Sequence, residues 1–217
     1  FNYKKYNTQL CPLALWGAPM QMRSAKLLLC TVTLLLPSLP VLAADPVTEL
    51  VSVDSAGTEG NHNSIQGSVS ADGRYVAFRS RASNLEVGDT SPWTDIFVHD
   101  RQTRTTTVVS INSDGSVGNQ ESVSPSISWD GRFIAFASWA TNLVAGDTNQ
   151  KGDIFVHDRQ TGAISRISVD SSGDQGNGGE SDEPVISGDG RFIAFVSWAT
   201  NLVAGDTNQK GDIFVHD

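Results

Sequence analysis

Cysteine is nearly absent from this sequence, and acidic residues are absent from its first 44 positions. The two cysteines, Cys11 and Cys30, both lie in that first stretch. The rest of the chain therefore has no disulfide and no cysteine ligand for a metal. Three catalytic signatures are also missing: the Gly-x-Ser-x-Gly nucleophile turn, the His-Glu-x-x-His pair and the phosphate-binding glycine loop. The sequence thus gives no motif-based support for a serine hydrolase, a metallopeptidase or a nucleotide-binding enzyme.

The acid-free stretch has the pattern of a secretory signal peptide. Residues 22–26 form a short basic start, residues 27–35 are apolar, and Val41-Leu42-Ala43 is a small-residue cleavage signal. The apolar run is about half the length that a membrane span needs. We interpret residues 22–43 as a signal peptide and residues 1–21 as read-through upstream of the natural start, with no domain. The prediction is an exported protein, periplasmic or extracellular, that does not span a membrane.

The charge of the remaining chain is strongly negative. All 24 acidic residues follow the predicted cleavage site, with 11 basic ones, which are the 15 of the whole chain less four in the first 44 positions. Because no basic cluster is present, nucleic-acid binding, which needs Lys and Arg against phosphates, is disfavoured. Divalent cations and basic partners are compatible with this charge.

An internal repeat dominates the rest of the sequence. Residues 130–158 recur as residues 189–217 with one change, and residues 72–100 are a more diverged third copy. The copies begin 58 and 59 residues apart. Self-similarity at a fixed period indicates one supersecondary unit that buries its apolar faces against neighbouring copies.

Each copy contains four short strand-like runs, which in the second copy are Ser124–Ser128, Arg132–Ser138, Asp153–His157 and Ala163–Val169. The dipeptide Asp130-Gly131 predicts a tight turn between the first two runs, and residues 158–162 predict a hairpin between the last two. The central runs are apolar at every position, which indicates strands covered on both faces. The first run has small residues, which suit a crowded central axis, and the fourth is more polar, which suits an outer edge. Four such antiparallel strands predict an all-β chain made of β-propeller blades.

The repeated motifs resemble a known family. The pattern Ser-x-Asp-Gly-Arg-(Tyr/Phe)-(Val/Ile)-Ala-Phe, then Asn-Leu-x-x-Gly-Asp-Thr and Asp-Ile-Phe-Val-x-Asp-Arg-x-Thr, is similar to the WD40-like (PD40) repeat of TolB-type propellers over about residues 50–217. The resemblance implies part of a six-bladed propeller in a domain of residues 44–217. Its blade repeats are about 50–111, 112–169 and 170–217, the third incomplete, so missing blades or other copies are needed to close the ring. The α/β domain of TolB has no counterpart here, so the Tol–Pal interaction is not carried over.

Long loops carry the candidate calcium ligands. Carboxylate and amide oxygens at nearby loop positions suit Ca²⁺, and the alternative is that they cap turns through their own backbone. The first copy has Ser91 in place of the asparagine and is followed by Pro92-Trp93, so we expect a weaker site there. The candidate ligands are Asp147, Asn149 and Asp153, repeated as Asp206, Asn208 and Asp212, with the weaker copy at Asp89 and Asp95.

Histidines and tryptophans also recur with the repeat. One metal could not reach equivalent positions in different copies, so we expect the three histidines to be strand-end residues near solvent. We expect the tryptophans to pack between blades, and the alternative is an aromatic platform for a ligand. The residues are His99, His157 and His216, and Trp129, Trp139 and Trp198.

The function favoured by these observations is that of an exported, non-catalytic binding scaffold. Its long loops share one end of the blades and would present a surface to a protein or glycan ligand. One alternative is the propeller portion of an exported hydrolase or polysaccharide lyase, since propellers resembling this one gate the active site of prolyl-oligopeptidase-type hydrolases. Another is a calcium-stabilised surface propeller.

Overall fold

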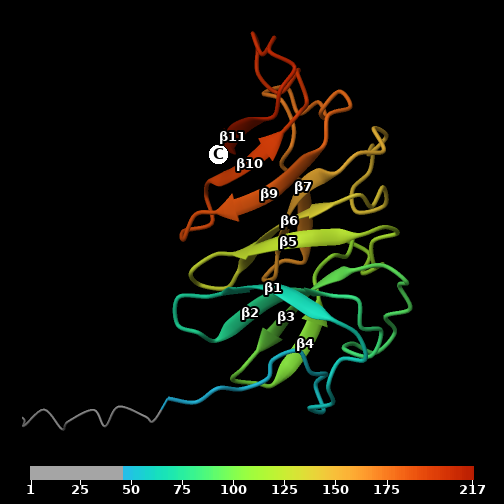
Figure 1. Ribbon diagram of the computed structural model, residues 1–217, viewed down its shortest axis with the longest axis vertical. Coiled ribbons are helices and arrows are strands. Elements are labelled where there is room, and N and C mark those ends of the chain that lie inside the picture. The colour runs from blue at the N-terminus through green and yellow to red at the C-terminus, as the bar shows by residue number, and fades with distance from the viewer. Residues whose placement is uncertain (1–45) are drawn as a thin grey trace, which may run out of the picture. The chain divides into compact units, whose positions relative to one another are not determined.

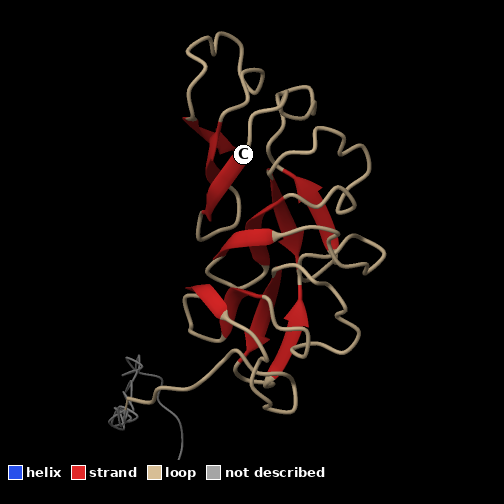
Figure 2. Ribbon diagram, turned by 45° about the vertical axis from the view of Figure 1, so that its right-hand side comes forward, coloured by secondary structure: helices blue, strands red, loops and turns tan. Residues whose placement is uncertain are grey.

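The computed structural model describes residues 46–217, and residues 47–217 form one compact unit. These residues are built from strands and loops, as Figure 2 shows, and no helix long and apolar enough to cross a membrane occurs among them. The predicted signal peptide, the segment before it and both cysteines lie outside the described residues. The all-β prediction is confirmed.

Eleven strands form three antiparallel sheets, which we call sheets 1, 2 and 3 in chain order (Figure 1). Within each sheet, strands that follow one another in the chain are hydrogen-bonded neighbours. Sheet 1 contains β1 (Ser64–Val69), β2 (Tyr75–Ser80), β3 (Asp95–Asp100) and β4 (Thr105–Val108). Sheet 2 contains β5 (Ser122–Ile127), β6 (Phe133–Ser138), β7 (Asp153–Asp158) and β8 (Ala163–Arg166). Sheet 3 contains β9 (Ser181–Ile186), β10 (Ile193–Ser197) and β11 (Asp212–His216).

The turn between the first two strands of each sheet is made as the sequence predicts. In sheet 2, Asp130 Oδ1 accepts hydrogen bonds from the Ser128 hydroxyl at 2.6 Å and from the Arg132 amide at 3.0 Å. Gly131 has φ +72°, a conformation that glycine adopts without strain. The local side-chain bonds therefore fix where β5 ends and β6 begins.

The last strand of sheet 2 is shorter than predicted. The sequence suggested a strand to Val169, but β8 ends at Arg166. The Val169 amide bonds to the Ile167 carbonyl at 2.8 Å, which closes a tight turn at Ser168 and ends the extended conformation. The apolar pattern continues through this turn, so the pattern alone could not locate it.

The first strands of successive sheets lie side by side, with β5 between β1 and β9 (Figure 1). The Ser124 amide bonds to Gln66 Oε1 at 3.2 Å, and the Ile186 amide bonds to Ser126 Oγ at 3.1 Å. Each of these strands carries a bulge, with a residue of φ close to +55° at Gln66, Ser124 and Glu183. The bulges bend the strands where the three sheets converge, which is the arrangement of propeller blades around an axis.

The core lies between the sheets. Ile96 and Val98 of sheet 1 belong to one buried cluster with Ile134 and Phe136 of sheet 2. Residues of sheet 2, such as Ile154, form a second cluster with Ile186, Ile193 and Phe195 of sheet 3. The prediction that the central strands of sheet 2 are covered on both faces is therefore confirmed.

The outer face of sheet 3 is uncovered in the described chain. Ile213 and Val215 are 73% and 66% exposed, whereas their equivalents in sheet 2, Ile154 and Val156, pack against sheet 3. Three sheets do not close a ring, and one apolar blade face remains in contact with solvent.

Candidate functional site

The predicted calcium ligands lie in the loop between the second and third strands of each sheet, at the long-loop end. In sheet 2 the loop runs from β6 to β7, and Asp153 is the first residue of β7. Asp147 and Asp153 are both buried. Two carboxylates are thus held below the loop surface, where each needs a hydrogen bond or an opposite charge.

In sheet 2 the opposite charge comes from Arg166, a residue that the loop motif does not include. Its Nη1 lies 3.5 Å from Asp147 Oδ1 and 3.8 Å from Asp153 Oδ2, and it donates a hydrogen bond to Gln175 Oε1 at 2.8 Å. These distances allow charge attraction with both carboxylates but not short hydrogen bonds. The guanidinium therefore marks a point on which the two carboxylates converge.

Asn149 lies in the same cluster but turns its amide nitrogen toward the acceptors. Its Nδ2 donates to Asp153 Oδ2 at 3.0 Å and to the Gly176 carbonyl at 3.3 Å. Its Oδ1 accepts from the Lys151 amide at 3.0 Å, so it also caps its own turn. The structure brings the three predicted residues of sheet 2 together, with donors of this chain pointing at the acidic oxygens.

Burial dominates the ionisation of this pair. It raises the pKa of Asp147 to about 6, with the Asp153 carboxylate adding to the shift and Arg166 opposing it. Burial also raises the pKa of Asp153, against hydrogen bonds from Ser168 and Asn149. Both carboxylates would be easier to ionise beside an additional positive charge.

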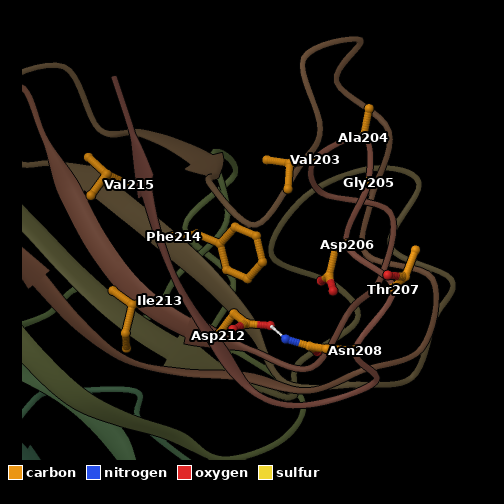
Figure 3. A pocket seen from close by; sticks show the side chains of 10 residues that line it. All are labelled: Val203, Ala204, Gly205, Asp206, Thr207, Asn208, Asp212, Ile213, Phe214 and Val215. Carbon is orange, nitrogen blue, oxygen red and sulfur yellow. Dashed lines mark hydrogen bonds between the residues drawn. The ribbon is translucent and has the colours of Figure 1, made fainter.

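The copy in sheet 3 (Figure 3) is less buried than the copy in sheet 2. Asp206, Asn208 and Asp212 line a hollow of about 530 Å³, and Asn208 Nδ2 donates to Asp212 Oδ2 at 2.8 Å. Asp206 Oδ2 is buried and has no hydrogen-bond partner. The hydrogen bond between the asparagine and the second aspartate of sheet 2 is thus repeated in sheet 3.

The copy in sheet 1 has the same two carboxylates with a different surrounding. Asp89 and Asp95 are 7% and 1% exposed, and burial raises the pKa of Asp95 to about 7. Ser110 donates to Asp95 Oδ1 at 2.9 Å, but Asp95 Oδ2 has no hydrogen-bond partner. Across residues 46–217, no three His, Cys, Asp or Glu side chains converge as a ready-made metal cluster.

At the opposite end of the sheets, each Asp-Gly-Arg turn is tied to the hairpin that follows the third strand. Arg132 donates to both carboxylate oxygens of Asp158, at 2.9 and 2.7 Å, and Arg74 binds Asp100 at the same distances. The Arg132 hydrogen bond is the main cause that holds the pKa of Asp158 well below its usual range. The two partners are 26 residues apart in the sequence, and only their recurrence in each copy could have signalled the pairing.

The expectation that the histidines lie near solvent was wrong for two of them. His99 and His157 lie one residue from the ends of their strands, as expected, but are only 4% and 5% exposed. Both lie inside six-residue strands, and His99 Nδ1 is 2.8 Å from Thr106 Oγ1 of the adjacent strand β4. Strand β4 covers His99, which a strand-by-strand reading of the sequence does not show.

The tryptophans differ from one another. Trp139 packs in the cluster between sheets 2 and 3, as predicted. Trp129 and Trp198 are 70% and 50% exposed, and a side chain at Gly188 would collide with the Trp129 ring. These two rings therefore rest on backbone and leave one face in solvent.

No protein-family model matches the chain, and a search of curated proteins finds no match. Among solved structures, TolB from Acinetobacter baumannii is 19% identical with a TM-score of 0.42, over 72% of this chain and 30% of that one. Putative TolB from Agrobacterium tumefaciens is 19% identical with a TM-score of 0.44, over 69% and 41%. The propeller domain of the Trilobed protease from Pyrococcus furiosus is 18% identical with a TM-score of 0.45, over 74% and 41%. The chain spans less than half of each of these proteins, and the blade assignment rests on its own sheets.

Proposed function

We propose that this chain is an exported, non-catalytic propeller scaffold that binds a protein or glycan ligand through its long-loop end. The observation that carries the proposal is a repeated clamp between the two long loops of each sheet. The Asn119 amide bonds to Asn142 Oδ1 at 2.9 Å, and Asn142 Nδ2 bonds to the Val117 carbonyl at 2.9 Å. The same pair of bonds recurs between Asn61 and Asn84 and between Asn177 and Asn201, with only the carbonyl partner changed.

The clamp makes the long loops suitable for recognition. Loops with fixed backbones lose less conformational entropy when they bind than free loops do. Their tips expose carboxylates, and the chain after the predicted cleavage site is strongly acidic, which favours a ligand that carries basic groups. The exposed carboxylates are Glu59, Asp114, Glu121, Asp174 and Glu180.

A panel of immobilised glycans, with and without free amino groups, and of lysine-rich peptides would test the binding face. We expect the double variant Asp114→Lys/Asp174→Lys to lose most binding at low salt. The matched control Gln102→Lys/Gln160→Lys, at the opposite end of the same sheets, should bind like the wild type. A loss in the control alone would place the ligand at the Asp-Gly-Arg end, and no binding by any form would reject the proposal.

Export is supported by the composition of residues 22–43, and a reporter tests it separately. Fused ahead of an alkaline phosphatase that is active only outside the cytoplasm, this segment should give activity. Replacing Leu27–Leu29 with aspartates should abolish the activity because the apolar region would be interrupted. Activity that is unchanged by this replacement would contradict export by this segment.

A further inference from the structure

The acidic loop clusters of sheets 1 and 2 are equivalent in position but not in charge. Arg166 pairs with Phe155 across β7 and β8, and Val108 pairs with Phe97 across β3 and β4. The strand register therefore places Val108 in sheet 1 where Arg166 lies in sheet 2. A neutral side chain stands where sheet 2 has its only cation between the two carboxylates.

The other donors of sheet 2 are also replaced in sheet 1. By the repeat, Ser91 takes the position of Asn149, and Val117 takes the position of Gln175. In sheet 2, Asn149 donates to Asp153 Oδ2, and Gln175 holds the Arg166 guanidinium. Sheet 1 keeps the two aspartates, and the serines Ser91 and Ser110 are the polar groups around them, without the arginine, asparagine and glutamine of sheet 2.

The negative charge of the sheet 1 cluster is higher as well. Asp89 and Asp95 are kept, and Glu86 stands where sheet 2 has Val144. The Glu86 carboxylate accepts a hydrogen bond from the Val108 amide, and its pKa is raised by burial and by the nearby Asp89. Full ionisation of the three carboxylates would give three negative charges in sheet 1, and burial opposes that ionisation in the absence of a cation. In sheet 2 two carboxylates and one guanidinium leave one net negative charge.

One buried oxygen of this cluster has no hydrogen-bond partner among residues 46–217. Asp95 is 1% exposed, and its Oδ2 makes no hydrogen bond. The equivalent oxygen, Asp153 Oδ2, faces both the Arg166 guanidinium and the Asn149 amide. An ionised carboxylate in such a place is stabilised by a positive partner, and without one burial favours its protonated form.

We propose that sheet 1 binds a calcium ion between Asp89 and Asp95, at the point that the Arg166 guanidinium takes in sheet 2. Both groups offer hard oxygen ligands, which Ca²⁺ prefers, and the Ser91 hydroxyl, backbone carbonyls and water would complete the shell. Because only two carboxylates converge, the affinity belongs in the millimolar range of extracellular calcium modules. The sequence alone predicts a weaker site in sheet 1, because Ser91 replaces the asparagine, whereas this proposal ranks it above the site of sheet 2. This inference does not depend on the proposed function.

The first test is thermal unfolding of the full chain in EDTA and in 10 mM CaCl₂. A site of about 1 mM affinity should raise Tm by about 3–5 °C in calcium, and magnesium should have a smaller effect because it dehydrates reluctantly. Equal Tm values in EDTA and calcium would overturn the proposal.

The second test exchanges the two residues between sheets. Val108→Arg should raise Tm in EDTA and remove most of the calcium-dependent shift, because the guanidinium occupies the site. Arg166→Val should lower Tm in EDTA and enlarge the calcium-dependent shift, because it removes the cation that lies between Asp147 and Asp153. A calcium shift in Val108→Arg that equals the wild-type shift would place calcium elsewhere and overturn the proposal.

A third measurement does not need the exchanged variants to fold. Terbium binds calcium sites and emits when a nearby tryptophan is excited, and Trp93 is two residues from Asp95. Terbium emission from the wild type should be displaced by calcium and should fall several-fold in Trp93→Phe. The Trp93→Phe variant should keep the wild-type calcium shift in Tm. Emission that is unchanged in Trp93→Phe would contradict the location.

Discussion

At the scale of single residues, arginine has two different roles in this chain. Arg132 pairs with Asp158 at the turn end, where it is partly exposed, and Arg166 lies among buried carboxylates at the long-loop end. The first pair joins the Asp-Gly-Arg turn before β6 to the hairpin that follows β7. The second balances charge that the fold has removed from water. The residues are alike in chemistry, and burial decides their roles.

The Arg132–Asp158 pair predicts a pH-dependent contribution to stability. The pKa of Asp158 is lower in the folded chain than in the unfolded chain, where it is about 3.9. Its contribution is therefore complete above pH 4 and is lost as the pH falls through the lower folded pKa. We expect Arg132→Gln to lower Tm by about 2–4 °C at pH 6 and by clearly less at pH 2, where Asp158 is protonated in the unfolded chain, as thermal unfolding across this range would show.

Arg159→Gln is the matched control for this prediction. Arg159 Nη1 donates to the Gly131 carbonyl at 2.8 Å and lies 4.2 Å from the centre of the Tyr75 ring. Neither partner changes its charge between pH 2 and 6, and the repulsion between Arg159 and protonated His157 is a minor contribution, so the effect of this variant should depend on pH much less than that of Arg132→Gln. A deficit for Arg132→Gln that is the same at both pH values would rule out the ionic contribution.

At the scale of strands and turns, the sequence predicted most of what is observed. The Asp-Gly dipeptides located the turns because their side-chain bonds are local, and the apolar runs located the central strands because both faces are buried. The prediction failed where distant segments decide the outcome. His99 is covered by β4, and the role of Arg166 depends on Asp147, 19 positions earlier in the chain. Comparison of the copies was the available signal, since Val108 replaces the arginine in the first.

The central strands should dominate the stability of the described unit. Phe136 is fully buried and stacks on Phe155 with ring centres 6.0 Å apart. We expect Phe136→Ala to lower the free energy of unfolding by about 3–5 kcal/mol, because it removes apolar contacts and leaves a cavity. Urea denaturation would measure the change. Phe192→Ala, at a ring that is 39% exposed, should cost much less, and equal losses would contradict a core between the sheets.

At the scale of the whole described unit, the uncovered face of sheet 3 should govern behaviour in solution. Ile213 and Val215 expose apolar surface that their equivalents in sheet 2 bury. Such faces promote self-association. We expect Ile213→Lys/Val215→Lys to reduce light scattering at high protein concentration several-fold. Val87→Lys, at a fully exposed and isolated valine, should leave scattering unchanged, and a similar decrease for both would indicate a general effect of charge.

The aromatic residue after each Asp-Gly-Arg turn has an evolutionary consequence. A side chain on Gly131 would meet the Tyr75 ring of sheet 1 at 2.1 Å, and one on Gly190 would meet the Phe133 ring of sheet 2 at 2.4 Å. Each repeat thus supplies an aromatic ring that packs on the next repeat. It also supplies a glycine on which the ring of the previous repeat packs. A gene duplication that adds a whole repeat therefore adds both the ring and the glycine of this contact in one step. Such an array can lengthen in one genetic step, which fits the near identity of the last two copies.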